Sequence, residues 1–180
     1  MFDKLLNFVP NGYKIEVDIL FRRVNSVLGG YLRGQVFLIV FVALALFIIL
    51  TILGVKFALL LAVFSGFAEI VPIIGPILAA SVAALAAYIG GTSNVGLAPL
   101  QMALAVVVVY TVVRQIQDYL VNPFVMGKIT KLHPLVILFS VIAGEHIAGI
   151  VGLILAVPIA AVIKIIFEYS LDRINLNDSH

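Results

Sequence analysis

The stretch "FAEIVPIIGPIL", residues 67–78, decides how this chain folds, because it sets one carboxylate and two prolines inside a long apolar run. From residue 57 to residue 87 the only acidic or basic side chain is Glu69. Pro72 and Pro76 each remove a backbone hydrogen bond, so they kink or end a helix at this point. The stretch therefore predicts a broken apolar helix with a charged group beside the break.

The composition identifies the solvent around this break. Hydrophobic residues make up 63% of the 180 residues, charged residues make up 11%, and the mean hydropathy is +1.23. A soluble domain is nearer half apolar and about a quarter charged. The apolar residues form long uncharged runs, and about 20 such residues cross a bilayer as a helix. We therefore expect an all-α integral membrane protein, a polytopic helix bundle with Pro/Gly-broken or re-entrant helical hairpins.

Several functional classes are disfavoured by what the sequence lacks. A net charge of +2 is too small to indicate nucleic acid as a partner, and without cysteine there is no thiolate metal site. His133, His146 and His180 lie far apart without metal-ligand spacing, and no GxxxxGK[ST] motif for nucleotides occurs. We expect no metal, no cofactor and no enzymatic activity, because the sequence shows no nucleophile–base pair and no metal cluster.

Polarity divides the chain into three parts. Residues 1–34 form a cytoplasmic or interfacial amphipathic segment with helical spacing, in which Asp18 and Arg22 make a favourable i,i+4 pair. The alternative is a helix packed on a soluble neighbour. Residues 35–167 form the transmembrane domain, with about five membrane segments of which two are short or broken. Residues 168–180 form a cytoplasmic tail.

The positions of lysine and arginine predict the orientation in the membrane. If 57–71 with 77–89, and 135–143 with 147–167, each form a hairpin, ten of the eleven basic residues fall on one side. The positive-inside bias then places that side and both termini in the cytoplasm. If 135–143 only enters the membrane and returns, the tail lies on the other side.

Two apolar stretches are interrupted in comparable ways, at residues 66–81 and 143–163, and each has a Glu before a break rich in Gly and Pro. In lipid, broken backbone survives only where it is buried in protein or lines water. Paired interrupted segments point to the central site of a transporter. We expect Glu69 to face a polar pocket where freed carbonyls bind a cation or a solute hydroxyl. The alternative is that Pro72 and Pro76 only kink a helix around a neighbour, with Glu69 near the outer interface.

A second polar cluster lies in "RQIQDYLVNPFVMGK", residues 114–128. Arg114, Gln117 and Asp118 fall within one helical turn, and Arg114 and Asp118 are spaced to pair at i,i+4. We expect Asn122-Pro123 to end this helix, because proline disfavours helical geometry in the residue before it. The alternative is a cytoplasmic loop with ordinary interfacial charges.

Five blocks of sequence, in order, resemble the autoinducer-2 exporter family of permeases. They are "LGGYLRGQ" (28–35), "IVPIIGP" (70–76), "QDYLVNPFVMGK" (117–128), "LHPL" (132–135) and "GIVGLILAVPIAAVIK" (149–164). The "GEH" at 144–146 differs from the small apolar sequence that the family has there. The matching motifs imply functional roles for Glu69, Pro72, Gly75, Pro76, Gln117, Asp118, Asn122 and Pro123, and helix breaks at Gly149, Gly152 and Pro158.

The resemblance covers only the C-terminal part of the family's usual length, which is roughly twice that of this chain. It implies either part of a longer transporter or a short relative that assembles to supply the missing helices. It also implies a multi-pass protein of the bacterial inner (plasma) membrane that forms homo-oligomers.

The leading hypothesis is gradient-driven export of a small polar solute or signal molecule such as autoinducer-2, with Glu69 or Asp118 carrying protons by alternating between charged and neutral forms. The alternative is a cation/proton antiporter in which these two carboxylates bind Na⁺ or H⁺. A membrane scaffold, from another class, would tolerate alanine at both positions.

Overall fold

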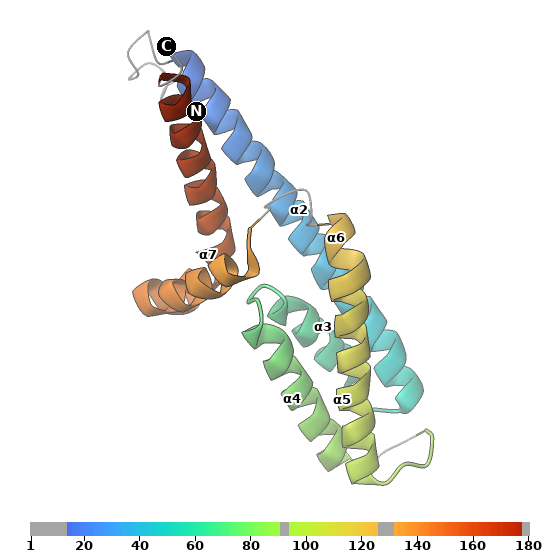
Figure 1. Ribbon diagram of the computed structural model, residues 1–180. Coiled ribbons are helices and arrows are strands. Elements are labelled where there is room, and N and C mark those ends of the chain that lie inside the picture. Colours follow the sequence, from blue (N-terminus) through green and yellow to red (C-terminus); the bar gives the residue numbers. More distant parts are fainter. Residues whose placement is uncertain (1–13, 91–93, 126–131, 178–180) are drawn as a thin grey trace. The chain divides into compact units, whose positions relative to one another are not determined.

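The computed structural model describes residues 14–90, 94–125 and 132–177, and within these ranges every regular element is a helix (Figure 1). The ends of the chain (1–13, 178–180) and the "MGK" of the second polar cluster lie outside the described residues. The helices are α2 (Lys14–Leu53), α3 (Ala58–Ala68), α4 (Ile74–Gly90), α5 (Pro99–Ile116), the π-helix η1 (Gln117–Val121), α6 (Asn122–Val125) and α7 (Pro134–Asn177).

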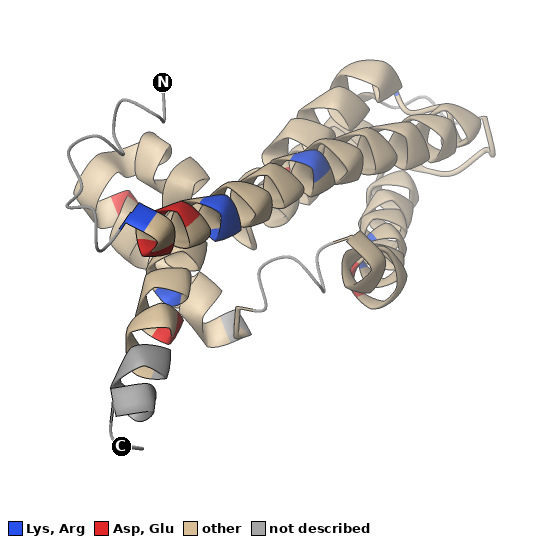
Figure 2. Ribbon diagram, turned by 90° about the horizontal axis from the view of Figure 1, so that it is seen from above, with Lys and Arg blue, Asp and Glu red and all other residues tan. Residues whose placement is uncertain are grey.

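Helix length and polarity confirm an all-α membrane protein. Three helical stretches are long and apolar enough to cross a membrane, Lys14–Leu53, Pro99–Val125 and Leu135–Leu171. Two shorter apolar helices, Ala58–Ala68 and Ile74–Gly90, accompany them. Acidic and basic residues are sparse along the helices (Figure 2), as a hydrocarbon surrounding requires.

The described chain divides into two compact units. The central unit comprises residues 33–90 and 94–125, and the terminal unit comprises residues 14–32 and 132–177. Helix α2 runs without interruption through residue 35, where the sequence predicts the change from the amphipathic segment to the transmembrane domain.

The core of the central unit is formed by residues at helical spacing on α2, α4 and α5. Side chains four residues apart lie on one helix face, and every fourth residue of α4 is a buried alanine, which allows its neighbours to approach closely. Helix α4 lies beside α5 (Figure 1). The buried side chains include Val42, Leu46 and Leu50 of α2, Ala79, Ala83 and Ala87 of α4, and Met102, Val106 and Tyr110 of α5.

The break predicted within residues 67–78 is present, between the end of α3 and the start of α4. The intervening backbone includes Ile73 with φ +69°, a conformation outside a right-handed helix. The chain reverses so tightly that a methyl group on Gly75 would lie 2.6 Å from the carbonyl carbon of Ala68. Helix α3 is 11 residues long, about 16 Å at 1.5 Å per residue, too short to cross a ~30 Å hydrocarbon core alone.

A second helical hairpin forms the start of α7 in the terminal unit. Ala148 and Gly149 have non-helical dihedral angles, with Gly149 at φ +58° and ψ −134°, so the helix folds back here (Figure 1). Behind this turn the backbones of Gly144 and Gly152 are in direct contact. The "GEH" at 144–146 is helical and lies in the first arm. Pro158 lies inside the second arm, which continues as a helix.

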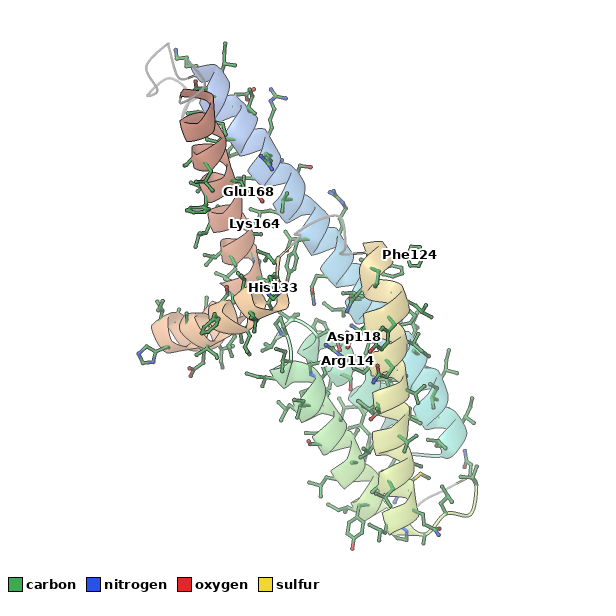
Figure 3. The ribbon with its side chains drawn as sticks, in the orientation of Figure 1. Arg114, Asp118, Phe124, His133, Lys164 and Glu168 are labelled. Carbon is green, nitrogen blue, oxygen red and sulfur yellow. The ribbon has the colours of Figure 1, made fainter. Side chains whose placement is uncertain are left out.

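An ion pair joins the two terminal segments within this unit. Arg23 Nη2 of α2 lies 3.0 Å from Glu168 Oε2 of α7, and Lys164 Nζ lies 3.7 Å from Glu168 Oε1 (Figure 3). The pair predicted between Asp18 and Arg22 is confirmed, with Arg22 Nε 2.7 Å from Asp18 Oδ2.

Candidate functional site

Glu69 occupies the first position after α3, and its side chain is only 8% exposed. Its Oε2 accepts a hydrogen bond of 2.7 Å from Gln117 Nε2, and Arg114 Nη1 lies 3.5 Å from the same oxygen. The backbone carbonyl of Glu69 accepts a 2.9 Å bond from Gln35 Nε2 of α2. At the helix break, therefore, α2 holds the backbone of Glu69, and the α5–η1 helix holds its buried carboxylate.

Arg114 connects this buried carboxylate to a second one. Arg114 Nε lies 2.9 Å from Asp118 Oδ2, which confirms the predicted i,i+4 pair, and Asn122 Nδ2 donates to Asp118 Oδ1 at 3.0 Å. Figure 3 shows Arg114 and Asp118 close together along the same helix. We call Glu69, Arg114, Gln117, Asp118 and Asn122 the carboxylate network. It holds two carboxylates and one guanidinium, so its formal charge is −1 when all three groups are ionised.

A π-helix positions the members of this network. The helix expected to end at Asn122-Pro123 instead continues to Val125, through η1 and α6. Proline in a helix lacks an N–H and its ring clashes with the carbonyl four residues earlier. The wider π turn just before Pro123 relieves this conflict without ending the helix, and such bulges are frequent at functional sites. Gln117, the first residue of η1, is thereby buried against Glu69.

The carboxylate network lies at a cavity of about 330 Å³ within the central unit. The polar residues that line it are Ser65, Glu69, Tyr110, Thr111, Arg114, Gln115 and Gln117. The remaining wall is aliphatic or proline, with Val42, Leu46, Ile73, Pro76, Ile77, Ala79, Ala80, Val107 and Val113. The pocket expected beside Glu69 is present, but most of its lining is hydrocarbon rather than freed backbone carbonyls.

Two hydroxyl groups in the cavity wall were not singled out from the sequence. Ser65 Oγ and Tyr110 Oη lie 2.7 Å apart, and both side chains are buried. Each hydroxyl belongs to a polar residue on the buried face of an otherwise apolar helix, and this position in the sequence could have identified both as candidate site residues. Gln35, on the face of α2 that carries Tyr31 and Leu38, offered the same signal.

The remaining predicted site residues fall in two places. Pro72 and Gly75 form the break beside the cavity, whereas Pro123 follows the π-helix and is exposed. Gly149, Gly152 and Pro158 belong to the terminal unit, where only Gly149 lies at the helix break; Gly152 and Pro158, expected to be breaks as well, are helical in the second arm. Within the described ranges, no group of three or more His, Asp or Glu side chains is arranged to hold a metal ion.

Long apolar helices with a broken hairpin and a buried carboxylate beside a cavity are features found in membrane proteins of the transporter class. Residues 1–172 match the profile of the AI-2E family transporter, and the chain belongs to this family. It is 32% identical over 162 residues to "Putative transport protein YueF" of Bacillus subtilis (strain 168), covering 90% of this chain and 42% of that protein.

Two further relatives give the same result. The chain is 32% identical over 162 residues to the B. subtilis protein YrrI, covering 90% of this chain and 44% of YrrI. It is 28% identical over 154 residues to "Putative permease PerM" of Escherichia coli (strain K12), covering 83% of this chain and 40% of that protein. The chain spans less than half the length of these relatives.

Proposed function

We propose that this chain is part of a gradient-driven transporter that exports a small polar solute or signal molecule through the cavity of the central unit. One observation carries the proposal: Glu69 is buried in a helix break, beside a cavity large enough for a small solute. An ionisable group buried inside a membrane protein is costly, and such groups mark substrate or ion pathways. Autoinducer-2, the family's namesake solute, is a candidate cargo.

The coupling follows from how Arg114 is shared. Its guanidinium lies closer to Asp118 (2.9 Å) than to Glu69 (3.5 Å), so the ion pair with Glu69 is the looser of the two. When a proton or another cation binds to Glu69, the ion pair between Glu69 and Arg114 breaks and Arg114 pairs with Asp118 alone. When the proton or cation leaves, Arg114 is again shared between the two carboxylates. The charge that Glu69 presents to the cavity thus depends on whether the coupling ion is bound.

The test is solute efflux from proteoliposomes, with and without an imposed proton or sodium gradient. Glu69→Gln keeps the shape of the side chain and removes its charge, so gradient-driven efflux falls at least about tenfold, as for loss of a buried charge interaction. Asp18→Asn, which removes a carboxylate from an exposed pair, leaves efflux unchanged. Unaltered flux in Glu69→Gln with intact assembly removes Glu69 from the mechanism.

A cation/proton antiporter is the second candidate, and the formal charge of −1 on the carboxylate network favours it. Carboxylate and amide oxygens suit a hard cation such as Na⁺. A sodium-driven pH change in vesicles without any organic solute supports this function. No pH change under a sodium gradient contradicts it.

The proposal includes orientation and assembly. Both termini lie in the cytoplasm of a bacterial cell, by the bias of basic residues, and the chain works as a homo-oligomer in the inner membrane. Labelling of single introduced cysteines from outside intact cells tests the orientation, since the chain has no native cysteine. Mass measurement of the purified protein in detergent tests the assembly.

A further inference from the structure

The hydroxyl groups of the cavity wall have a fixed hydrogen-bond direction. Ser65 Oγ lies 2.7 Å from the carbonyl oxygen of Leu61, to which it donates its single hydrogen. Ser65 Oγ therefore only accepts in its 2.7 Å contact with Tyr110 Oη, and the tyrosine is the donor of that bond. The hydrogens of both groups are engaged with the protein.

The same direction holds for the third hydroxyl. Thr111 Oγ1 donates to the carbonyl oxygen of Val107 at 2.8 Å. Of the hydroxyls that line the cavity, Ser65, Tyr110 and Thr111 all give their hydrogens to protein atoms. These three hydroxyl oxygens can offer a ligand only their lone pairs. This part of the wall therefore accepts hydrogen bonds and donates none.

The charge beside the cavity points the same way, because the carboxylate network carries a formal charge of −1 when its three groups are ionised. Gln117 and Arg114 both contact Oε2 of Glu69, and among the described residues no hydrogen bond is made to Glu69 Oε1. Arg114 is the only basic residue in the described lining, and it is shared with Asp118. A carboxylate oxygen without a hydrogen bond among the described residues, in the same lining as three acceptor hydroxyls, favours a ligand that is positively charged and carries hydrogen-bond donors.

The aliphatic part of the cavity wall favours an organic cation over an inorganic one. A bare metal cation takes six or more oxygen ligands in typical sites, and the aliphatic side chains that make up most of this wall offer none. A cavity of about 330 Å³ is instead of the size that holds a small organic molecule. Hydrocarbon on the ligand would pack against hydrocarbon on the wall.

We propose, building on the transport function above, that the cavity of the central unit takes a small organic cation, with a primary ammonium group at Glu69 and an apolar body against the aliphatic wall. An ammonium has three N–H donors and no acceptor, which complements the acceptor hydroxyls. Neutral polyols and anions of equal size fit this wall less well.

The first test compares three probes of equal chain length: 6-aminohexan-1-ol (cation), hexane-1,6-diol (neutral) and 6-hydroxyhexanoate (anion). Binding to the purified chain in detergent is measured by titration calorimetry at neutral pH. The amine binds at least about tenfold more tightly than the diol, because its hydrogen bonds are charge-assisted, and the anion binds least. Equal affinity for amine and diol overturns the proposal.

The second test reverses a hydrogen-bond direction. In Ser65→Ala the hydroxyl of Tyr110 loses its acceptor and turns its hydrogen toward the cavity, so the preference for the amine over the diol falls several-fold. Tyr110→Phe instead frees a lone pair of Ser65 Oγ, which still donates to Leu61, so the acceptor is kept and the preference for the amine changes less than in Ser65→Ala. Ser81→Ala is the matched control, because Ser81 also donates to the carbonyl four residues earlier (Ile77, 2.8 Å) but lies outside the cavity lining.

Flux assays separate failure of this inference from failure of the proposed function. If proteoliposomes export the diol or the anion as fast as the amine, the preference for an organic cation is refuted and the proposed transport function stands. Sodium or proton flux with no flux of any probe also refutes it, and favours the antiporter. If neither a probe nor an ion moves, the transport function itself is refuted. An unchanged helical circular dichroism spectrum shows that each variant is folded.

Discussion

Replacing Gly75 by alanine tests the packing on which the site depends. The new methyl group would lie 2.6 Å from the carbonyl carbon of Ala68, and closer still to its oxygen. The optimum for carbon contacts is about 3.5–4.0 Å, so the two helices must separate by about 1 Å. Because the obstructing atoms are backbone, no side chain can rotate away to relieve the contact.

The expected loss of stability combines two opposing effects. Overpacking of this kind costs about 1–3 kcal/mol or more, whereas alanine gains up to about 1 kcal/mol over glycine in a helix. We expect a net loss of about 1–2 kcal/mol, because Gly75 lies in the first turn of α4, where the gain in helix propensity is smaller than in a helix interior. For a protein of this size the melting temperature then falls by about 2–8 °C.

The measurement is thermal unfolding in detergent followed by circular dichroism, since the chain is helical and has no tryptophan. Gly90→Ala is the matched control in the same helix. Its methyl group would meet Lys56 Cβ at 3.6 Å, an ordinary contact, so this variant is as stable as the wild type or slightly more so. Equal melting temperatures for Gly75→Ala and the wild type would refute the close approach of α3 and α4.

Three further predictions follow from the described residues. Gly149→Ala lowers the melting temperature, because φ +58° with ψ −134° is a conformation open to glycine and costs other residues about 1–3 kcal/mol. Arg114→Lys reduces efflux several-fold, since a point-charge ammonium does not bridge two carboxylates as a guanidinium does; the exposed Arg33→Lys leaves efflux unchanged. Arg23→Ala changes the free energy of unfolding by less than about 1 kcal/mol in denaturant titrations, because its pair with Glu168 is exposed.

Features set by local chemistry were predictable from the sequence. Hydropathy identified the membrane class, and the prolines after Glu69 located the break between α3 and α4. The i,i+4 spacing identified the pair between Arg114 and Asp118. Each of these depends on residues a few positions apart, where helix geometry alone fixes the distance.

Features set by packing between helices were not predictable in the same way. The bond from Gln35 to the backbone of Glu69, and that from Tyr110 to Ser65, join residues 34 and 45 positions apart. Nothing in a single sequence fixes which faces of two helices meet. The π-helix also escaped prediction, since proline indicates a disturbed helix without specifying whether the helix ends or widens.

The structure separates what holds Glu69 in place from what its side chain binds. Its backbone is fixed by the bond from Gln35 and by the tight turn between Ala68 and Gly75. Its carboxylate contacts a different set of groups, Gln117 and the shared Arg114. Since the two sets do not overlap, the carboxylate can gain or lose a proton or a ligand while the hairpin keeps its backbone position. A group that must change its charge repeatedly inside a membrane protein needs this independence, because each change would otherwise disturb the fold around it.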